Sequence, residues 1–366
     1  MAGDGFCLGA VKRKGVQTDE VKRAAHECGF ELVGVARAEP LEEVVWYREW
    51  LAAGMAGEMA YLGGRGAELR ADPRSLLASA RSVICVGKLY NTAHPQSGSL
   101  TDPERGWVSR YAWGQDYHTV VRAGLELLLE KLRSLVGRPF EARICTDAEP
   151  LLERSLARRA GLGWSGRNTC LINQWQGSWF VLGELVVSLD LEPDAPAAER
   201  CGSCKRCIEA CPTGALIPTG RAGGPGWTLE ARRCISYLTI ELRGAIPEAL
   251  RPALGHHVFG CDICQEVCPW NRKAAISGEG AFQPSHYAPR LAELVAMSGA
   301  EFRQRFAGSP LARARRRGLR RNAAVAMGNS AWSGHRPWLE RMARDADAVV
   351  AEHARWALER IEAACR

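Results

Sequence analysis

Apolar and polar residues alternate along the first half of the chain with two different periods. Apolar residues recur at helical spacing over residues 21–28 and 117–136, and short apolar runs suited to strands lie between and after them. We expect strands over residues 30–36, 82–90, 140–146 and 179–189, and a further helix over residues 151–160 that is closed by Gly161. Helices and strands that alternate in this way predict an α/β (α+β) domain.

The pattern changes after residues 192–200, a segment rich in proline and charge. A block of cysteines follows, and from Leu291 onward the pattern is helical. Two late segments, RRNAAVAMGNSAW and VVAEHARWALERIEAAC, resemble one helical hairpin of the kind stacked in α-solenoids, although one pair establishes no repeat. We therefore expect a disordered leader (1–17), the α/β domain (18–195), a cysteine-rich domain (196–275) and an all-helical, HEAT-like cap (280–366).

Composition favours a soluble protein. Charged residues make up 24% of the 366 residues, and no stretch approaches the roughly 18 apolar residues that span a bilayer. Near the start, the basic residues Lys12, Arg13 and Lys14 follow a short apolar stretch, whereas a secretion signal carries its charge before the stretch. We expect a cytoplasmic protein, in which thiols stay reduced.

Eight of the fourteen cysteines lie between residues 201 and 268 at short, regular spacings. The first four are separated by two, two and three residues and are followed by Pro212, which is the bacterial ferredoxin pattern, in which the fourth cysteine binds the other cluster. This exchange of the fourth cysteine between the two sites predicts a ferredoxin-like domain with two 4Fe-4S clusters. The predicted ligands are Cys201, Cys204, Cys207 and Cys268 for one cluster, and Cys211, Cys234, Cys261 and Cys264 for the other.

Two alternatives to this interpretation stay open at this point. Paired cysteines at this spacing also bind structural zinc, although zinc seldom needs the full ferredoxin run. Two clusters alone would make an electron carrier, whereas reduction of an organic bond usually needs a flavin, a corrinoid or a similar centre. The other cysteines are interpreted as core or incidental residues: Cys7, Cys28, Cys85, Cys145, Cys170 and Cys365.

Several stretches resemble the epoxyqueuosine reductases, which depend on cobalamin and iron–sulfur clusters, act on tRNA and are related to reductive dehalogenases. The matching stretches are LRADPRSLLASARSVICV, SRYAWGQDYH, TDAEPLLERSLARRAGLGWSGRNTCLI, CGSCKRCIEACPTGAL, RCISYLTIE and GCDICQEVCPWN. They span nearly the whole chain. The resemblance implies reduction of epoxyqueuosine in tRNA to queuosine, with electrons passed through the clusters to cobalamin.

The resemblance makes Asp147 the general acid, since removal of an epoxide oxygen as water consumes two protons. Such an acid needs a raised pKa near neutral pH, which desolvation would provide. The alternative is that Asp147 only caps a helix that begins near Pro150.

The resemblance also implies cobalamin contacts, and these rest on weaker matches. Asp116-x-His118 begins a cobalt-ligating histidine motif, but Val121 replaces its glycine, so no histidine ligand to cobalt is expected. Tyr117 and His118 are secondary candidates for substrate contact. The positions that match the family's cobalamin-binding stretches are Arg70, Ser109, Asp147, Arg167, Leu171, Ser178 and Ser236.

Positive charge gathers in residues 313–321, which hold six arginines in a chain of net charge +7. Such a run is often a solvated helix face. With a tRNA substrate, phosphate contacts become the use expected for Arg320 and Arg321, and for Arg154 beside the pocket.

We therefore expect a monomeric epoxyqueuosine reductase that receives single electrons from an external donor of the flavodoxin or ferredoxin type. The alternatives are a cobalamin-dependent reductive dehalogenase of small organohalides and a non-catalytic iron–sulfur electron-transfer protein. The basic C-terminal segment argues against the dehalogenase. A protein that binds no cobalamin would favour the electron carrier.

Overall fold

The computed structural model of the protein describes residues 16–220 and 226–365. Most of the leader expected over residues 1–17 lies outside the described residues, as does Cys7. Among the described helices, none combines the length and the apolar character needed to cross a membrane.

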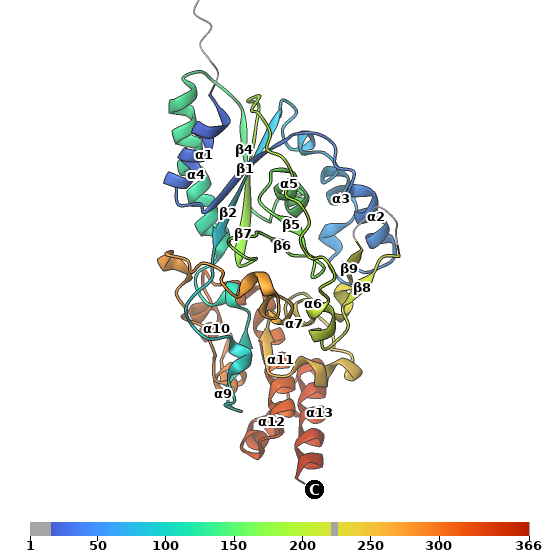
Figure 1. The fold of residues 1–366 in the computed structure, drawn as a ribbon. Coiled ribbons are helices and arrows are strands. Elements are labelled where there is room, and N and C mark those ends of the chain that lie inside the picture. Colours follow the sequence, from blue (N-terminus) through green and yellow to red (C-terminus); the bar gives the residue numbers. More distant parts are fainter. Residues whose placement is uncertain (1–15, 221–225, 366) are drawn as a thin grey trace, which may run out of the picture.

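A four-stranded sheet forms the centre of the N-terminal half (Figure 1). The four predicted strands are confirmed, and every neighbouring pair is antiparallel, so the domain belongs to the α+β class. The central strand β2 is buried along its whole length, as its apolar run predicts. In spatial order the strands are β1 (Leu32–Arg37), β2 (Ser82–Leu89), β7 (Phe180–Val187) and β4 (Ala142–Cys145).

Helices cover both faces of this sheet. α1 (Thr18–Glu27) and α4 (Tyr117–Val136) pack on one face, and α5 (Glu153–Arg159) packs on the other (Figure 1). The Asp116 carboxylate caps the start of α4, and Gly137 ends the helix in a left-handed conformation with φ of 62°. These local signals are why the predicted helix over residues 117–136 is confirmed at both ends.

The cysteine-bearing part consists of short elements joined by turns. One hairpin lies between its cysteines, and β10 pairs in parallel with β3 (Trp107–Val108), which ties this part to the N-terminal half. Its elements are α6 (Arg206–Ala210), β8 (Leu216–Pro218), β9 (Trp227–Leu229), α7 (Ile235–Ile240), β10 (His257–Phe259) and α8 (Ile263–Glu266).

The remainder of the chain is helical, as predicted. α11 and α13 lie so close that a Cβ added at Gly328 would come within 2.8 Å of the Cα of Ala357. Buried side chains from Val108, Phe259 and Val325 belong to one continuous core, so the helical part and the cysteine-bearing part share it. The helices are α9 (Leu291–Ala296), α10 (Gly299–Arg305), α11 (Arg315–Ser330), α12 (Arg336–Met342) and α13 (Ala348–Ala364).

Candidate active site

A pocket of about 440 Å³ opens between the loop after β4, the hairpin strand β9 and helix α2 (Val44–Ala52). Trp46, Tyr47 and Trp50 of α2 form an aromatic wall, and the Trp50 indole N–H donates to the Leu229 carbonyl of β9 at 2.6 Å. Aromatic faces suit the stacking of a flat base. The pocket brings together three residues predicted from the sequence, which are Arg70, Asp147 and Arg154.

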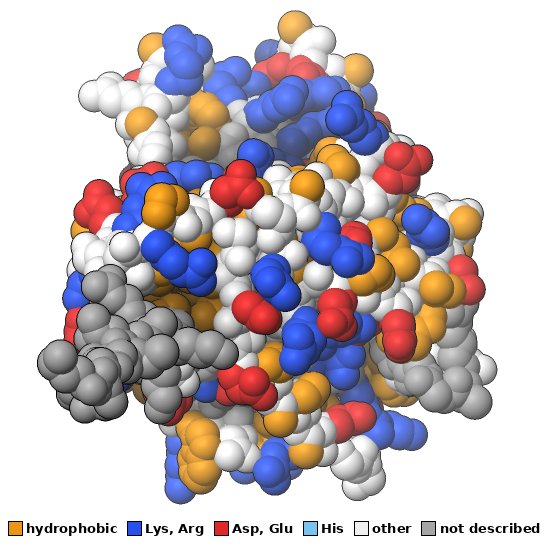
Figure 2. All heavy atoms as spheres, turned by 90° about the horizontal axis from the view of Figure 1, so that it is seen from above, with side chains coloured by type: hydrophobic (Ala, Val, Ile, Leu, Met, Phe, Trp, Pro, Cys, Tyr) orange, Lys and Arg blue, Asp and Glu red, His pale blue; other side chains and the backbone are white. Residues whose placement is uncertain are grey.

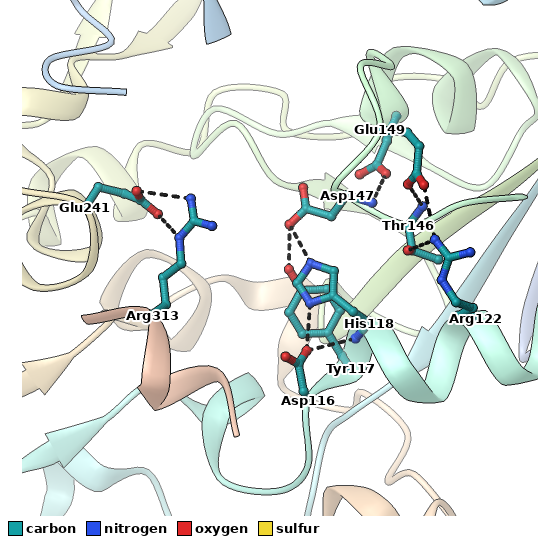
Figure 3. A network of polar contacts seen from close by, with 10 residues as sticks. Asp116, Tyr117, His118, Arg122, Thr146, Asp147, Glu149, Glu241 and Arg313 are labelled. Carbon is teal, nitrogen blue, oxygen red and sulfur yellow. Dashed lines mark hydrogen bonds and ion pairs between the residues drawn. The ribbon is translucent and has the colours of Figure 1, made fainter. Parts of the chain in front are cut away.

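The loop that carries Asp147 is held in an unusual backbone conformation. Asp147 has φ of +58°, and Thr169 on the pocket wall has φ of +64°. For residues other than glycine this conformation costs on the order of 1–3 kcal/mol and is concentrated at functional sites. The Asp147 N–H donates to Glu153 Oε1 at 2.5 Å, and the Thr146 N–H donates to Glu149 Oε2 at 2.8 Å. These two bonds hold the loop in place (Figure 3).

The Asp147 carboxylate points toward the start of α4 (Figure 3). It accepts a hydrogen bond of 2.5 Å from the Tyr117 hydroxyl, and His118 Nε2 lies 3.7 Å away. His118 Nδ1 in turn lies 2.7 Å from Asp116 Oδ1. The helix-cap alternative for Asp147 is wrong, because α5 begins only at Glu153 and its N-cap residue is Leu152. The Asp147 side chain is thus free for chemistry.

The surroundings of Asp147 set three pKa values apart. The ion pair with His118, followed by the hydrogen bond from Tyr117, outweighs burial and lowers the pKa of Asp147, so the raised pKa expected for this acid is wrong. The hydrogen bond to Asp116 and the ion pair with Asp147 raise the pKa of His118 to about 9. Burial, with the Asp147 charge, raises the pKa of Glu153 to about 8. Near neutral pH the protons therefore reside on the neighbours of Asp147.

Four of the eight clustered cysteines line one cavity of about 260 Å³: Cys201, Cys204, Cys207 and Cys268. They are the four that the crossing pattern assigns to one cluster. Burial and the charges of the other three raise the pKa of Cys207 to about 11, so cations beside its sulfur would be needed to keep Cys207 as a thiolate. This donor set fits an iron–sulfur cluster.

The other four cysteines are also neighbours. Burial raises the pKa of Cys234, with a contribution from the charge of Cys211, and the pKa of Cys261 rises through burial and the charge of Cys234. Cys264 lies close enough to Cys261 to feel its charge. Cys170, interpreted as incidental from the sequence, lies close enough to Cys264 that each thiol shifts the pKa of the other, so this cysteine belongs to the surroundings of the second set.

The arrangement of the sulfurs bears on the zinc alternative. Within the part of the chain that the structure describes, no three Cys, His, Asp or Glu side chains converge on a position for a single metal ion. The four cysteines of the first set instead line one cavity of about 260 Å³. Four cysteines around one cavity, in the ferredoxin sequence pattern, suit a multinuclear cluster better than one tetrahedral zinc ion.

The predicted cobalamin contacts are spread over two cavities and the core. Arg70 lines the pocket of Asp147, whereas Arg167 lines the cysteine cavity and donates to the Gly202 carbonyl at 2.6 Å. Leu171 is a buried core residue. The hydroxyls of two of the three serines bond within the protein: Ser109 to Asp262, and Ser178 to Gln265 and Asn271. Ser236 lies close enough to Cys234 to lower the pKa of its thiol.

The phosphate contacts predicted for α11 are wrong for Arg321 and unsupported for Arg320. Arg321 is only 1% exposed, and its guanidinium donates to the carbonyls of Leu238, Leu242 and Gly244. These carbonyls lie at and beyond the C-terminal end of α7, where backbone acceptors lack helical partners. The Arg320 side chain is 11% exposed and pairs with Asp345 at 2.6 Å. Neither side chain can reach a phosphate without leaving these partners.

Arg313, at the start of the same run, was not singled out from the sequence. Its side chain is 52% exposed and pairs with Glu241 at 2.9 Å (Figure 3). The Arg313 guanidinium also lies over the ring of Tyr61 on the pocket wall. Figure 2 shows Lys and Arg side chains interspersed with Asp and Glu on the face seen from above, so charge counting alone does not reveal such a position. Arg313 could have been singled out because it precedes α11, whereas Arg320 and Arg321 lie within this helix.

Comparisons with known proteins agree with these observations. Residues 70–148 match the family model "Epoxyqueuosine reductase QueG, DUF1730", and residues 200–271 match "4Fe-4S double cluster binding domain". Epoxyqueuosine reductases of Pseudomonas aeruginosa (44% identity; 93% of each chain) and Xanthomonas campestris pv. campestris (42%; 92% of this chain, 94% of the other) are similar. So is the structure of an epoxyqueuosine reductase with an epoxyqueuosine-modified tRNA stem loop, with a TM-score of 0.83, 29% identity, and coverage of 94% of this chain and 89% of the other.

Proposed function

The chain belongs to the epoxyqueuosine reductase family, and on that premise we propose that it removes the epoxide oxygen of epoxyqueuosine in tRNA, with Asp147 as the proton donor. The observation that carries this proposal is the pocket that joins an aromatic wall to the Asp147 carboxylate. The dehalogenase and electron-carrier alternatives are not favoured, because the relatives that match over nine-tenths of the chain are epoxyqueuosine reductases.

Removal of the epoxide oxygen as water takes two electrons and two protons. The eight clustered cysteines would hold the two iron–sulfur clusters, and these clusters and cobalamin, when bound, would supply the electrons. Because the pKa of Asp147 is lowered, its carboxyl first takes a proton from a protonated neighbour and then delivers it to the departing oxygen. The aromatic residues of α2 hold the modified base and keep water from it. His118 and Tyr117 fix the orientation of the Asp147 carboxylate through their contacts with it.

The pocket is a suitable place for a corrinoid. It extends from Asp147 to Ala231, and the Ala231 carbonyl accepts the N–H of Cys234, so a group in the pocket would lie between a cluster ligand and the acid. Guanidinium and hydroxyl groups of Arg70, Thr169 and Thr228 on its wall suit the amide side chains of the ring. We propose Arg70 as a contact, and Ser109, Arg167, Leu171, Ser178 and Ser236 as further candidates.

We also propose the partners of the enzyme. Arg154 on the pocket wall and Arg313 above Tyr61 are placed to meet phosphates of the tRNA. Arg167, Arg200 and Arg206 border the first cysteine cavity and would attract an acidic one-electron donor of the flavodoxin or ferredoxin type. We infer a monomeric, cytoplasmic enzyme with four parts at the boundaries expected from the sequence, the last of them HEAT-like.

The proposal is tested by single-turnover reduction of an epoxyqueuosine stem loop by the anaerobically reconstituted enzyme, followed by nucleoside mass spectrometry. Asp147→Asn is expected to lower the rate by about 100- to 10,000-fold, the usual contribution of a general acid. Asp190→Asn is the matched control, because this exposed carboxylate lies beyond the opposite end of β7 and β4. Unchanged RNA with the loaded wild-type enzyme would refute the function, and full activity of Asp147→Asn would refute the acid.

A further inference from the structure

Glu184 is a carboxyl buried in the middle of the sheet. It lies on the central strand β7, between Cys85 of β2 and Cys145 of β4, and it is 0% exposed. Among the described residues, neither of its carboxyl oxygens receives a hydrogen bond from an N–H or O–H group. An ionised carboxylate that lacks hydrogen-bond donors is strongly destabilised at such a buried position. The neutral acid form of Glu184 is therefore favoured.

The nearest polar group to Glu184 is another carboxyl, that of Glu153. Their side chains are within hydrogen-bonding distance, and two carboxyls can form such a bond only when one of them carries a proton. Burial, together with the charge of Glu153, raises the pKa of Glu184 well above its ordinary range. The pair therefore holds at least one proton at neutral pH.

The pair is joined directly to the loop of the proposed acid. Glu153 is the first residue of α5, lines the pocket and accepts the backbone N–H of Asp147. Glu153 thus lies between the Asp147 backbone and Glu184, and exposure falls from 56% for the Asp147 side chain to none for Glu184. A water molecule in the pocket can connect the first two carboxyls, because both line it.

We propose that Glu153 and Glu184 form a proton-sharing carboxylic acid pair that resupplies Asp147 with a proton between the two proton deliveries of one turnover. This inference rests on the proposed function. After Asp147 has protonated the departing oxygen it is a carboxylate. The O–H bond of Glu153 then breaks and that of Asp147 forms through an intervening water molecule, and Glu153 takes the proton of Glu184. The pair is refilled from solvent through the pocket.

The charged groups around the pair act in known directions. The Asp147 charge favours a protonated Glu153, whereas the Arg154 guanidinium and the Asp147 N–H favour an ionised Glu153. Glu184 faces Glu153, Asp147 and Glu149, which are all acidic, and the thiols of Cys85 and Cys145 flank it in the sheet. The charged groups that act on Glu184 are therefore all acidic.

Infrared spectroscopy of the full-length protein tests the pair without cofactors or RNA. The wild-type protein at pH 7 is expected to show the C=O stretching band of a carboxylic acid, shifted in D₂O, and Glu184→Gln is expected to lower its intensity, while Glu266, whose pKa is raised to about 7, keeps part of it. The matched control is Glu43→Gln, because Glu43 is also largely buried but pairs with Arg158 and Arg159. A wild-type protein without the band, or a band of unchanged intensity in Glu184→Gln, would overturn the pair.

The pH dependence of single-turnover reduction tests whether the Glu153–Glu184 pair resupplies Asp147 with a proton. The wild-type rate is expected to fall as pH rises through about 8, where Glu153 loses its proton. The amide of Glu184→Gln keeps a donor against Glu153, as the neutral acid does, but it cannot pass on a proton, so the rate below pH 8 should fall. An unchanged rate would overturn the resupply role even if the band is present.

The two tests separate the possible failures. If the wild-type enzyme leaves the RNA unreduced while the band is present, the proposed function fails and the acid pair stands. Should Glu184→Gln fail to fold, Glu153→Gln provides the same test from the pocket side. It should remove the fall near pH 8, and a fall that remains would overturn the proposal.

Discussion

Two charged regions of this protein differ in what their polar groups bond to. At the pocket, the Asp147 carboxylate is 56% exposed and meets ionisable partners, Tyr117 and His118. At the end of α7, the Arg321 guanidinium is 1% exposed and meets only backbone carbonyls and the side chain of Asn322. The first arrangement leaves protons and charge available to a ligand, while the second uses its charge to complete a helix end. Partners, rather than charge density, distinguish a reactive site from a structural one.

The largest expected effect comes from breaking the structural region. Arg321→Met leaves three carbonyls without their donor and should lower the free energy of unfolding by about 3–4 kcal/mol. Urea denaturation of the reconstituted protein measures it. Arg317→Met is the control, because this side chain is 47% exposed and its pair with Asp347 contributes about 0–1 kcal/mol. A stable Arg321→Met protein that loses RNA affinity would reverse the contrast between the regions.

A smaller effect is expected from the histidine at the pocket. Because the pKa of His118 is raised to about 9, its imidazolium stabilises the fold fully below its unfolded pKa of about 6.5, and this stabilisation is lost as pH rises through 9. His118→Gln should therefore be less stable than wild type by about 1 kcal/mol at pH 6, since the partly exposed group is screened. At pH 10 the two should be equal. Paired urea titrations at both pH values check this, and a constant difference would contradict it.

The smallest effect sharpens the comparison within the arginine run. Arg313→Ala should weaken binding of the stem loop by about three-fold and reduce its salt dependence by about one phosphate contact. Arg320→Ala should leave the affinity unchanged, because that side chain is 11% exposed and occupied by Asp345. Binding at two salt concentrations distinguishes them. If Arg320→Ala is the weaker binder, the phosphate site lies on α11 as the sequence first indicated.

Local signals explain which parts of the fold were predictable. The helix over residues 117–136 has a capping aspartate, an amphipathic period and a terminal glycine, and all three act within a few residues. The four strands could be predicted equally well from their apolar runs. The antiparallel order of the strands could not be predicted, because pairing depends on contacts between distant segments.

The sequence predicted which residues form the site better than it predicted their pKa values and partners. The motif located Asp147, but its left-handed backbone and lowered pKa come from Glu153, Tyr117 and His118, which the fold brings to it. Arg321 has the same sequence signature as a surface arginine, and only the carbonyls of α7 reveal its burial. Glu184 left one visible trace, a lone carboxylate within the apolar run WFVLGELVV.

The bonds from α11 to α7 also set an order of events during synthesis. All eight clustered cysteines leave the ribosome before Arg321 and Asn322 are translated. Until then, the carbonyls after α7 lack their guanidinium, and the Thr239 and Val258 carbonyls lack the Asn322 amide. Thr239 Oγ1 in turn accepts the N–H of Gly260, the residue before Cys261. The segment that carries the second set of cysteines thus reaches its final geometry only once the C-terminal helices have formed. A chain truncated before α11 would therefore expose these thiols before their surroundings have folded.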